Sequence, residues 1–308
     1  MKQHFISLAE IQARPLPPDF MTITGPLPHN LLNDLMFRIV FETNPEALKS
    51  LLCSLLHFKD SDIVSLEIKN PIHLGERIDS KTCIFDIYVL LNDQKKIHLE
   101  LQVLGQNFWT DRSLCYLCRS FGKLNSGEDY STIKPLIQID ILDFDLYKNS
   151  QEFYSVYHLA NDKTGRIYSS KIALHVLQLN KEEYATTEDK AYRIDYWARL
   201  FKATTWEELK MLAQEQKILQ STVETIYRVN ADDYVRAELD AREDALRVQR
   251  TFENELKSYN TILTEQKSKI AEQQTTIDEQ QSTIDEQNIQ LANKDAEIAR
   301  LKALLKKN

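Results

Sequence analysis

Glycine and proline are confined to the first part of this chain, and their distribution limits what the rest can fold into. The sequence has 308 residues, six glycines and eight prolines. The last glycine is Gly165 and the last proline is Pro135. Because these two residue types interrupt helices most strongly, the stretch 166–308 is free to form long helices.

Aliphatic residues recur every seven positions near the C-terminus. They are Leu256, Leu263, Ile270, Ile277, Ile284, Leu291, Ile298 and Leu305. A second seam, four residues before each of these, reads Phe252, Tyr259, Gln266, Gln273, Gln280, Gln287, Lys294 and Leu301. An apolar seven-residue repeat predicts a left-handed coiled coil, in which the glutamines lower stability and select the oligomeric state. We therefore expect a helical tail over 231–308 that forms a homo-oligomer; the alternative is a solitary, partly frayed helix.

The part before the tail mixes strand and helix patterns. Five prolines within 1–29 predict an extended lead-in. A helix is expected from Asp34 to Leu56 with an interruption near Pro45, another from Phe108 to Leu124, and several over 187–230. Strands are expected at Ile63–Ile68, Cys83–Leu91, Lys96–Val103, Leu136–Leu142, Phe153–Leu159 and Lys171–Leu179. One domain over 30–230 accommodates all of these elements.

Charge and composition exclude some classes of protein. The net charge is -8, so any contact with nucleic acid must come from a local basic patch. The tail carries 12 basic and 16 acidic residues and the remainder 26 and 30, so each part has a net charge of -4. No apolar stretch is long enough to span a membrane, and the N-terminus lacks a signal-type apolar region. Four scattered cysteines are typical of reduced thiols, which indicates a cytoplasmic protein.

The segment Cys83–Val103 carries the residues with the clearest chemical meaning. Each half alternates apolar and polar residues, as a strand with one buried face does. The polar positions are Asp86, Tyr88, His98, Glu100 and Gln102. A three-residue loop at 92–94 keeps apolar residues opposite apolar ones and sets Leu91 opposite Lys95. This register places Asp86 directly opposite Glu100.

Two carboxylates side by side repel each other unless something compensates their charge. A hard divalent cation such as Mg²⁺ takes oxygen ligands, and one or two carboxylates with water suffice to hold it. Such an ion polarises a phosphoryl oxygen and lowers the pKa of a bound water. The alternative is an ordinary hairpin whose charged residues occupy a solvated face, although aspartate is disfavoured within strands.

The order of several motifs resembles a known family. They are NDLMFRIVF at 33–41, IFDIYV at 84–89, IHLELQ at 97–102 and DRSLCYLCRSFGKLNSGEDYSTIKPLIQIDILDF at 111–144. Together they resemble the Rpn recombination-promoting nuclease and putative transposase family, within the PD-(D/E)XK nuclease superfamily, over roughly residues 30–230. The resemblance implies an α/β, restriction-endonuclease-like core, with a mixed sheet flanked by helices, and metal-dependent cleavage of DNA phosphodiesters.

The resemblance also implies roles for particular residues. Asp86 falls at the first metal-binding acid of the family and Glu100 at the second. Gln102 stands where the wider superfamily often has lysine, although glutamine is common in this family. This leaves open which group orients the attacking water, and Lys81 is one candidate.

Two further residues have both a functional and a structural interpretation. Asp34 matches an aspartate at the start of the first helix of the family, but an ordinary helix N-cap is the alternative. Arg112 lies four residues before Tyr116 on one helix face. It is either a phosphate contact or a packing residue whose stem covers apolar surface. His98 is a further candidate, as a ligand or a base, although a single histidine in a strand usually lies at the surface.

Two functions remain in competition at this point. The first is a Mg²⁺-dependent DNA endonuclease linked to recombination or mobile elements, with Asp86, Glu100 and Gln102 as its catalytic residues. The second is a catalytically weak or inactive nuclease fold that acts in assembly or regulation through its coiled coil. A DNA-binding module without cleavage is disfavoured because neither part of the chain is basic.

Overall fold

The computed structural model describes residues 8–16, 18–69, 87–105, 108–121 and 129–305. Its centre is a six-stranded sheet in the order β1-β2-β3-β4-β6-β5. The strands are β1 (Leu66–Ile68), β2 (Ile87–Leu91), β3 (Lys95–Gln102), β4 (Leu136–Leu142), β5 (Tyr154–Tyr157) and β6 (Ile172–Gln178). β3, β4 and β6 run parallel, whereas the β1-β2, β2-β3 and β5-β6 pairs are antiparallel. The predicted mixed sheet is confirmed.

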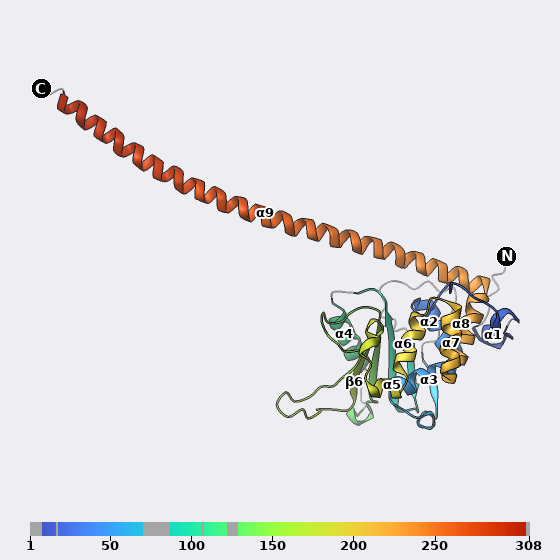
Figure 1. Cartoon of the computed structure of the whole chain (residues 1–308). Helices are drawn as coiled ribbons and strands as arrows, with labels where there is room; N and C mark the ends of the chain where they lie inside the picture. Colours follow the sequence, from blue (N-terminus) through green and yellow to red (C-terminus); the bar gives the residue numbers. More distant parts are fainter. Residues whose placement is uncertain (1–7, 17, 70–86, 106–107, 122–128, 306–308) are drawn as a thin grey trace. The chain divides into compact units, whose positions relative to one another are not determined.

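Helices lie on both sides of this sheet, as Figure 1 shows, with α4 on one side and α2, α6 and α8 on the other. The helices of the first part are α1 (Leu8–Ala13), α2 (Asp34–Thr43), α3 (Pro45–Leu55), α4 (Trp109–Phe121), α5 (Thr187–Ala191), α6 (Ile194–Lys202), α7 (Trp206–Glu215) and α8 (Gln220–Ala231). Short 3₁₀ helices are η1 (Pro18–Met21), η2 (Asp60–Asp62), η3 (Tyr130–Thr132), η4 (Leu179–Tyr184) and η5 (Lys217–Leu219). The predicted α/β class is thereby confirmed.

The main core lies between the apolar face of the sheet and the larger group of helices. Ile97 and Leu99 of β3 and Ile139 of β4 are fully or almost fully buried in it. Phe41 of α2 packs against Trp197 of α6 with ring centroids 6.0 Å apart. Burying aromatic and branched residues on the same strand face leaves the alternate residues for the other face, which α4 covers.

The β2-β3 hairpin has the predicted register over its described residues. Ile87 pairs with Leu99, and Leu91 pairs with Lys95. The loop turns because Asn92 and Asp93 adopt positive φ angles of 51° and 56°, a conformation that these residue types tolerate better than most. The three-residue loop is therefore confirmed.

The first strand is shorter than its pattern predicts. We expected a strand at Ile63–Ile68, but β1 begins only at Leu66. The backbone N–H groups of Val64 and Ser65 donate to the side-chain oxygen of Asn92, at 2.8 and 3.0 Å. Because that side chain satisfies these donors, the N–H groups of the two residues do not donate to a neighbouring strand.

The N-terminal lead-in is not simply extended. It contains α1 and η1, and Ile11 of α1 is fully buried. Arg14 forms an ion pair with Asp232 at 2.5 Å, and the Tyr227 hydroxyl donates to Asp19 at 2.7 Å. Proline disfavours helix only locally, so α1, which ends before Pro15, forms and packs on α2 and α8.

The C-terminal helix α9 (Asp233–Leu305) has 73 residues and runs from orange to red in Figure 1. The chain divides into two compact units, Met1–Ala245 and Leu246–Asn308. Val235 and Leu239, in the first turns of α9, are fully buried in the core of the first unit. In the described part of the chain, every helix is too short or too polar to cross a lipid bilayer.

Candidate active site

Polar side chains gather on the face of β3 and β4 that α4 covers. His98 and Glu100 of β3 lie beside Gln138 and Asp140 of β4, because the parallel register pairs His98 with Gln138 and Glu100 with Asp140. Glu100 is 4% exposed and Asp140 is 1% exposed. Burying four polar residues on one sheet face is costly unless each is hydrogen-bonded or paired, so their partners define the site.

Asp140 is held by residues of both the sheet and α4. The Ser113 hydroxyl donates to Asp140 Oδ2 at 2.5 Å. The Gln138 amide donates to Asp140 Oδ1 at 2.9 Å and to Ser113 Oγ at 2.8 Å. Burial raises the pKa of Asp140 to about 6, although the hydrogen bonds from Ser113 and Gln138 and the charge of Arg112 lower it in part. This three-residue network fixes α4 on the sheet.

Arg112, one residue before Ser113, brings a cation to the site. Its terminal nitrogen lies 3.6 Å from Glu100 Oε1, and its Nε donates to the Tyr116 hydroxyl at 2.8 Å. The guanidinium also lies over the rings of Trp109 and Tyr116, 5.4 and 5.1 Å from their centroids. A partly exposed cation thus lies beside a buried carboxylate, and a guanidinium is a group that can also bind a phosphate.

The structure brings together some of the residues that the sequence singled out. Glu100 and Arg112 are neighbours, and Gln102 ends the same strand, with its side-chain amide donating to the Leu104 carbonyl at 2.8 Å. Asp86 and Lys81 lie outside the described residues. Asp86 immediately precedes the first described residue of β2, Ile87.

Asp34 is the first residue of α2 but is not its N-cap. The N-cap of α2 is Asn33, whose side chain accepts from the backbone N–H groups of Leu35 and Met36, so an N-cap role for Asp34 is wrong. Asp34 forms an ion pair with Arg242 of α9 at 3.7 Å. Acidic residues in the first turn of a helix are stabilised by its dipole, which accounts for an aspartate at this place.

His98 is buried rather than at the surface, where a single strand histidine is usually found. Its ring meets Tyr88 of β2 edge-on, with centroids 4.7 Å apart and planes at 83°. The side chain is 2% exposed because α4 covers the strand face on which it lies. His98 therefore belongs to the same enclosed polar layer as Glu100.

The sequence analysis missed Ser113, Gln138 and Asp140. The signal was present in the strand Leu136–Leu142, where Gln138 and Asp140 interrupt an isoleucine-rich run at alternate positions. Alternate polar residues in an otherwise buried strand place both side chains on one face. The pattern did not indicate which other strand lies beside Leu136–Leu142 in the sheet.

The residues present are suited to a hard cation only in part. Glu100 and Gln102 offer oxygen donors, which Mg²⁺ prefers. Among the described residues, no group of three or more histidines, cysteines, aspartates or glutamates is arranged to hold a metal ion. The oxygen chemistry fits, and a complete ligand set requires Asp86.

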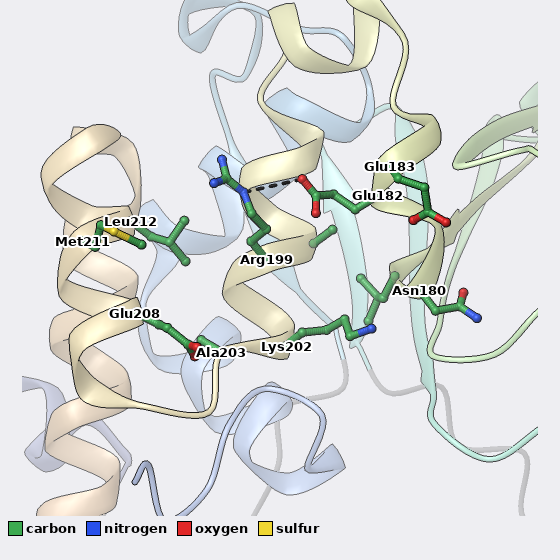
Figure 2. Close-up of a pocket in the computed structure, with 11 residues that line it drawn as sticks. Asn180, Glu182, Glu183, Arg199, Lys202, Ala203, Glu208, Met211 and Leu212 are labelled. Carbon is green, nitrogen blue, oxygen red and sulfur yellow. Dashed lines mark ion pairs between the residues drawn. The ribbon is translucent and has the colours of Figure 1, made fainter. Parts of the chain in front are cut away.

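A separate pocket of about 380 Å³ lies between η4, α6 and α7 (Figure 2). It is lined by Leu179, Asn180, Glu182, Glu183, Ala198, Arg199, Lys202, Ala203, Glu208, Met211 and Leu212. Arg199 pairs with Glu182 at 3.7 Å, the dashed contact in Figure 2. Glu208 accepts from the backbone of Thr204 at 2.7 Å at the start of α7. Arg199 and Glu182 thus join α6 to η4, and Glu208 caps the start of α7. None of the described residues proposed for catalysis lines this pocket.

The chain matches one family of known proteins. A family model described as PD-(D/E)XK nuclease family transposase covers residues 31–255. No curated protein and no solved structure matches the chain. The matched region is more than two thirds of the chain and includes β3, β4 and α4, the elements that position Glu100, Asp140 and Arg112. The chain therefore belongs to the PD-(D/E)XK nuclease family transposases, which gives it a nuclease or transposase-like function.

Proposed function

We propose that this protein is a metal-dependent DNA endonuclease that hydrolyses phosphodiester bonds in recombination or in the movement of mobile elements. The observation that carries the proposal is Glu100, a carboxylate 4% exposed, beside the Arg112 guanidinium. A nearly buried carboxylate paired with one partly exposed cation contributes little to stability, or lowers it. Such groups are common at functional sites.

The proposed chemistry divides among few residues. Asp86 and Glu100 would hold the divalent cation, Mg²⁺ in the first instance. When bound, that ion supplies Lewis acidity toward the phosphoryl oxygen and lowers the pKa of a coordinated water. The side-chain amide of Gln102, at the end of β3, would orient the attacking water.

Arg112 would contact the scissile phosphate. Its side chain is partly exposed, its Nε is fixed by Tyr116, and its terminal nitrogen lies 3.6 Å from Glu100. A planar guanidinium matches the geometry of a phosphate with two parallel hydrogen bonds. With a net charge of -8, the protein has no general attraction to DNA, so this local cation carries much of the contact.

The test is cleavage of supercoiled plasmid by the purified full chain, in Mg²⁺ or in EDTA. Asp86→Ala and Glu100→Ala are compared with wild type and with Asp162→Ala, which removes an exposed acid on a loop. Cleavage that needs the metal, survives in Asp162→Ala and is lost in the other two variants supports the proposal. Cleavage that is absent from wild type, or that both acid variants retain, overturns it.

A second proposal concerns α9, which would join chains into a homo-oligomer. Large apolar side chains on this helix, Leu256 and Ile277 among them, are about half exposed. A repeated apolar seam on a helix of this length is buried by a partner helix. Deleting 252–308 is expected to lower the mass measured in solution from an oligomer to a monomer, and an unchanged number of chains would contradict the proposal. If plasmid cleavage fails while this result holds, assembly through the tail becomes the better function.

A further inference from the structure

One row of apolar residues, spaced seven apart along α9, is partly exposed to solvent in the single chain. From Leu256 to Ile298, its seven members are between 47% and 64% exposed. They are Leu256, Leu263, Ile270, Ile277, Ile284, Leu291 and Ile298. Residues seven apart lie on one side of a helix, and in heptad notation these occupy the a positions.

The d positions, three residues after each a position, are mostly polar. Tyr259 and Leu301 flank a run of glutamines at Gln266, Gln273, Gln280 and Gln287, followed by Lys294. Among the described residues of α9, Gln274 and Gln281 donate to Asp278 and Asp285 at 2.9 Å. In the same part of the helix, the side chains of Gln273, Gln280 and Gln287 are exposed. Their carboxamides are available to another chain.

The two rows distinguish a parallel from an antiparallel pair of helices. In a parallel coiled coil in register, each layer combines a with a, or d with d. Isoleucine then meets isoleucine, and glutamine meets glutamine, whose amide can donate to the facing carbonyl. In an antiparallel pair each layer combines a with d. Every carboxamide in the repeat would then face an aliphatic side chain and lose its partner.

Residues at the two ends of the seam select the alignment. The repeats EQQTTID at 272–278 and EQQSTID at 279–285 would tolerate a shift of one heptad. Such a shift places Tyr259 against Gln266 and Leu301 against Lys294. Full register instead pairs Tyr259 with Tyr259 and Leu301 with Leu301, and Lys294 can extend its amine to solvent. It also sets Glu297 of one copy near Lys302 of the other, in the g and e positions that form interhelical ion pairs.

We propose that α9 forms a parallel, in-register pair with a second copy of this chain, in which layers of isoleucine or leucine alternate with layers of glutamine. This inference rests on the self-association proposed above and adds its orientation. Both Met1–Ala245 units would then be attached at the same end of the coil. An antiparallel pair would attach them at opposite ends of some 60 residues of helix, about 90 Å apart. Only the parallel pair brings two nuclease sites to one short stretch of DNA.

Disulfide trapping in the full chain tests the orientation. The double variant Tyr259→Cys/Ile298→Cys places one thiol at a d position and one at an a position, 39 residues apart, about 60 Å along one helix and too far to join within a chain. After mild oxidation, the parallel pair gives 259–259 and 298–298 disulfides between copies, identified by peptide mass. An antiparallel pair, in which each layer combines a with d, gives 259–298 disulfides, which would overturn the proposal.

Two controls make the result specific. Asp278→Cys/Asp285→Cys places thiols at b positions, on the outer side of the pair, and is expected to give no more disulfide than wild type, whose free thiols include Cys115 and Cys118. Sedimentation equilibrium of wild type is expected to give the mass of two chains. A mass of one chain overturns the self-association itself. A mass of two chains with 259–298 disulfides overturns only the orientation, and a mass of three chains overturns the pair.

Discussion

At the scale of single residues, the protonation of Asp140 is expected to affect folding. Its pKa is raised to about 6 by burial, so the folded protein binds a proton that the unfolded chain releases near pH 4. The contribution of Asp140 to the free energy of unfolding is then greatest below pH 4, falls as pH rises to about 6, and is constant above that pH. The loss amounts to about 3 kcal/mol, as an order of magnitude.

Asp140→Asn is expected to remove that dependence. The amide keeps the volume of the carboxyl and can bond to both Ser113 and Gln138, but it carries no charge at any pH in this range. Urea unfolding of variant and wild type at pH 4, 5, 6 and 7 measures the effect, and the difference between them cancels the other titrating groups. Equal changes in the free energy of unfolding over this range would contradict a raised pKa at Asp140.

Arg112 is expected to matter for DNA cleavage more than for folding. Arg112→Ala removes the guanidinium beside Glu100 and should lower kcat/KM for plasmid about 10- to 100-fold, the usual value of a charge-assisted contact. Lys163→Ala, a change of an exposed loop cation, serves as the control. If the two variants cleave equally well while circular dichroism shows both folded, Arg112 does not contact the phosphate.

At the scale of elements, the β2-β3 hairpin depends on Asn92. Its side chain accepts from Val64 and Ser65 and donates to the Asp62 carbonyl at 2.7 Å, which joins the hairpin loop to the chain before β1. Its backbone φ is 51°.

Asn92→Ala loses these bonds and keeps a Cβ at positive φ, so we expect a loss of about 1–3 kcal/mol in the free energy of unfolding. Asn92→Gly loses the bonds without the strain and should cost less. Urea denaturation of the two variants separates these contributions, and an alanine variant as stable as wild type would show that the loop is not held by this side chain.

The same elements show which features of the fold can be predicted from the sequence. The β2-β3 register was predictable because apolar alternation and loop length act over only a few residues, from Leu91 to Lys95. The strand Leu136–Leu142 was predictable as an element, but its parallel pairing with β3 joins residues about 40 positions apart and leaves no local pattern. Asp140 was therefore missed as the neighbour of Glu100. The helix α1 was missed because burial of Ile11 outweighed the nearby prolines.

At the scale of the whole molecule, the first unit needs the beginning of α9. We expected the nuclease-like part to end at residue 230, yet Val235 and Leu239 are fully buried in its core. His29, buried in the same unit, lies 3.0 Å from Asp240 and 3.2 Å from Glu243. The first turns of the long helix thus close the core.

A chain of residues 1–245 is therefore expected to fold, whereas residues 1–230 should be markedly less stable. Removing two buried aliphatic side chains costs about 2–5 kcal/mol each in typical cores, enough to lower Tm by many degrees. Thermal unfolding of the two truncated chains checks this. Equal Tm values would mean that the start of α9 contributes nothing to the first unit.

Glu100 is the residue on which the proposed metal-dependent nuclease site depends. The most direct measurement is the initial rate of plasmid nicking by Glu100→Gln and wild type across a range of Mg²⁺ concentrations. Glutamine keeps the size of the side chain and removes the charge that a divalent cation requires. We predict that wild type nicks DNA in proportion to bound Mg²⁺ and that Glu100→Gln is slower by about 100-fold or more at every concentration. Equal rates, or nicking by wild type in EDTA, would contradict the account.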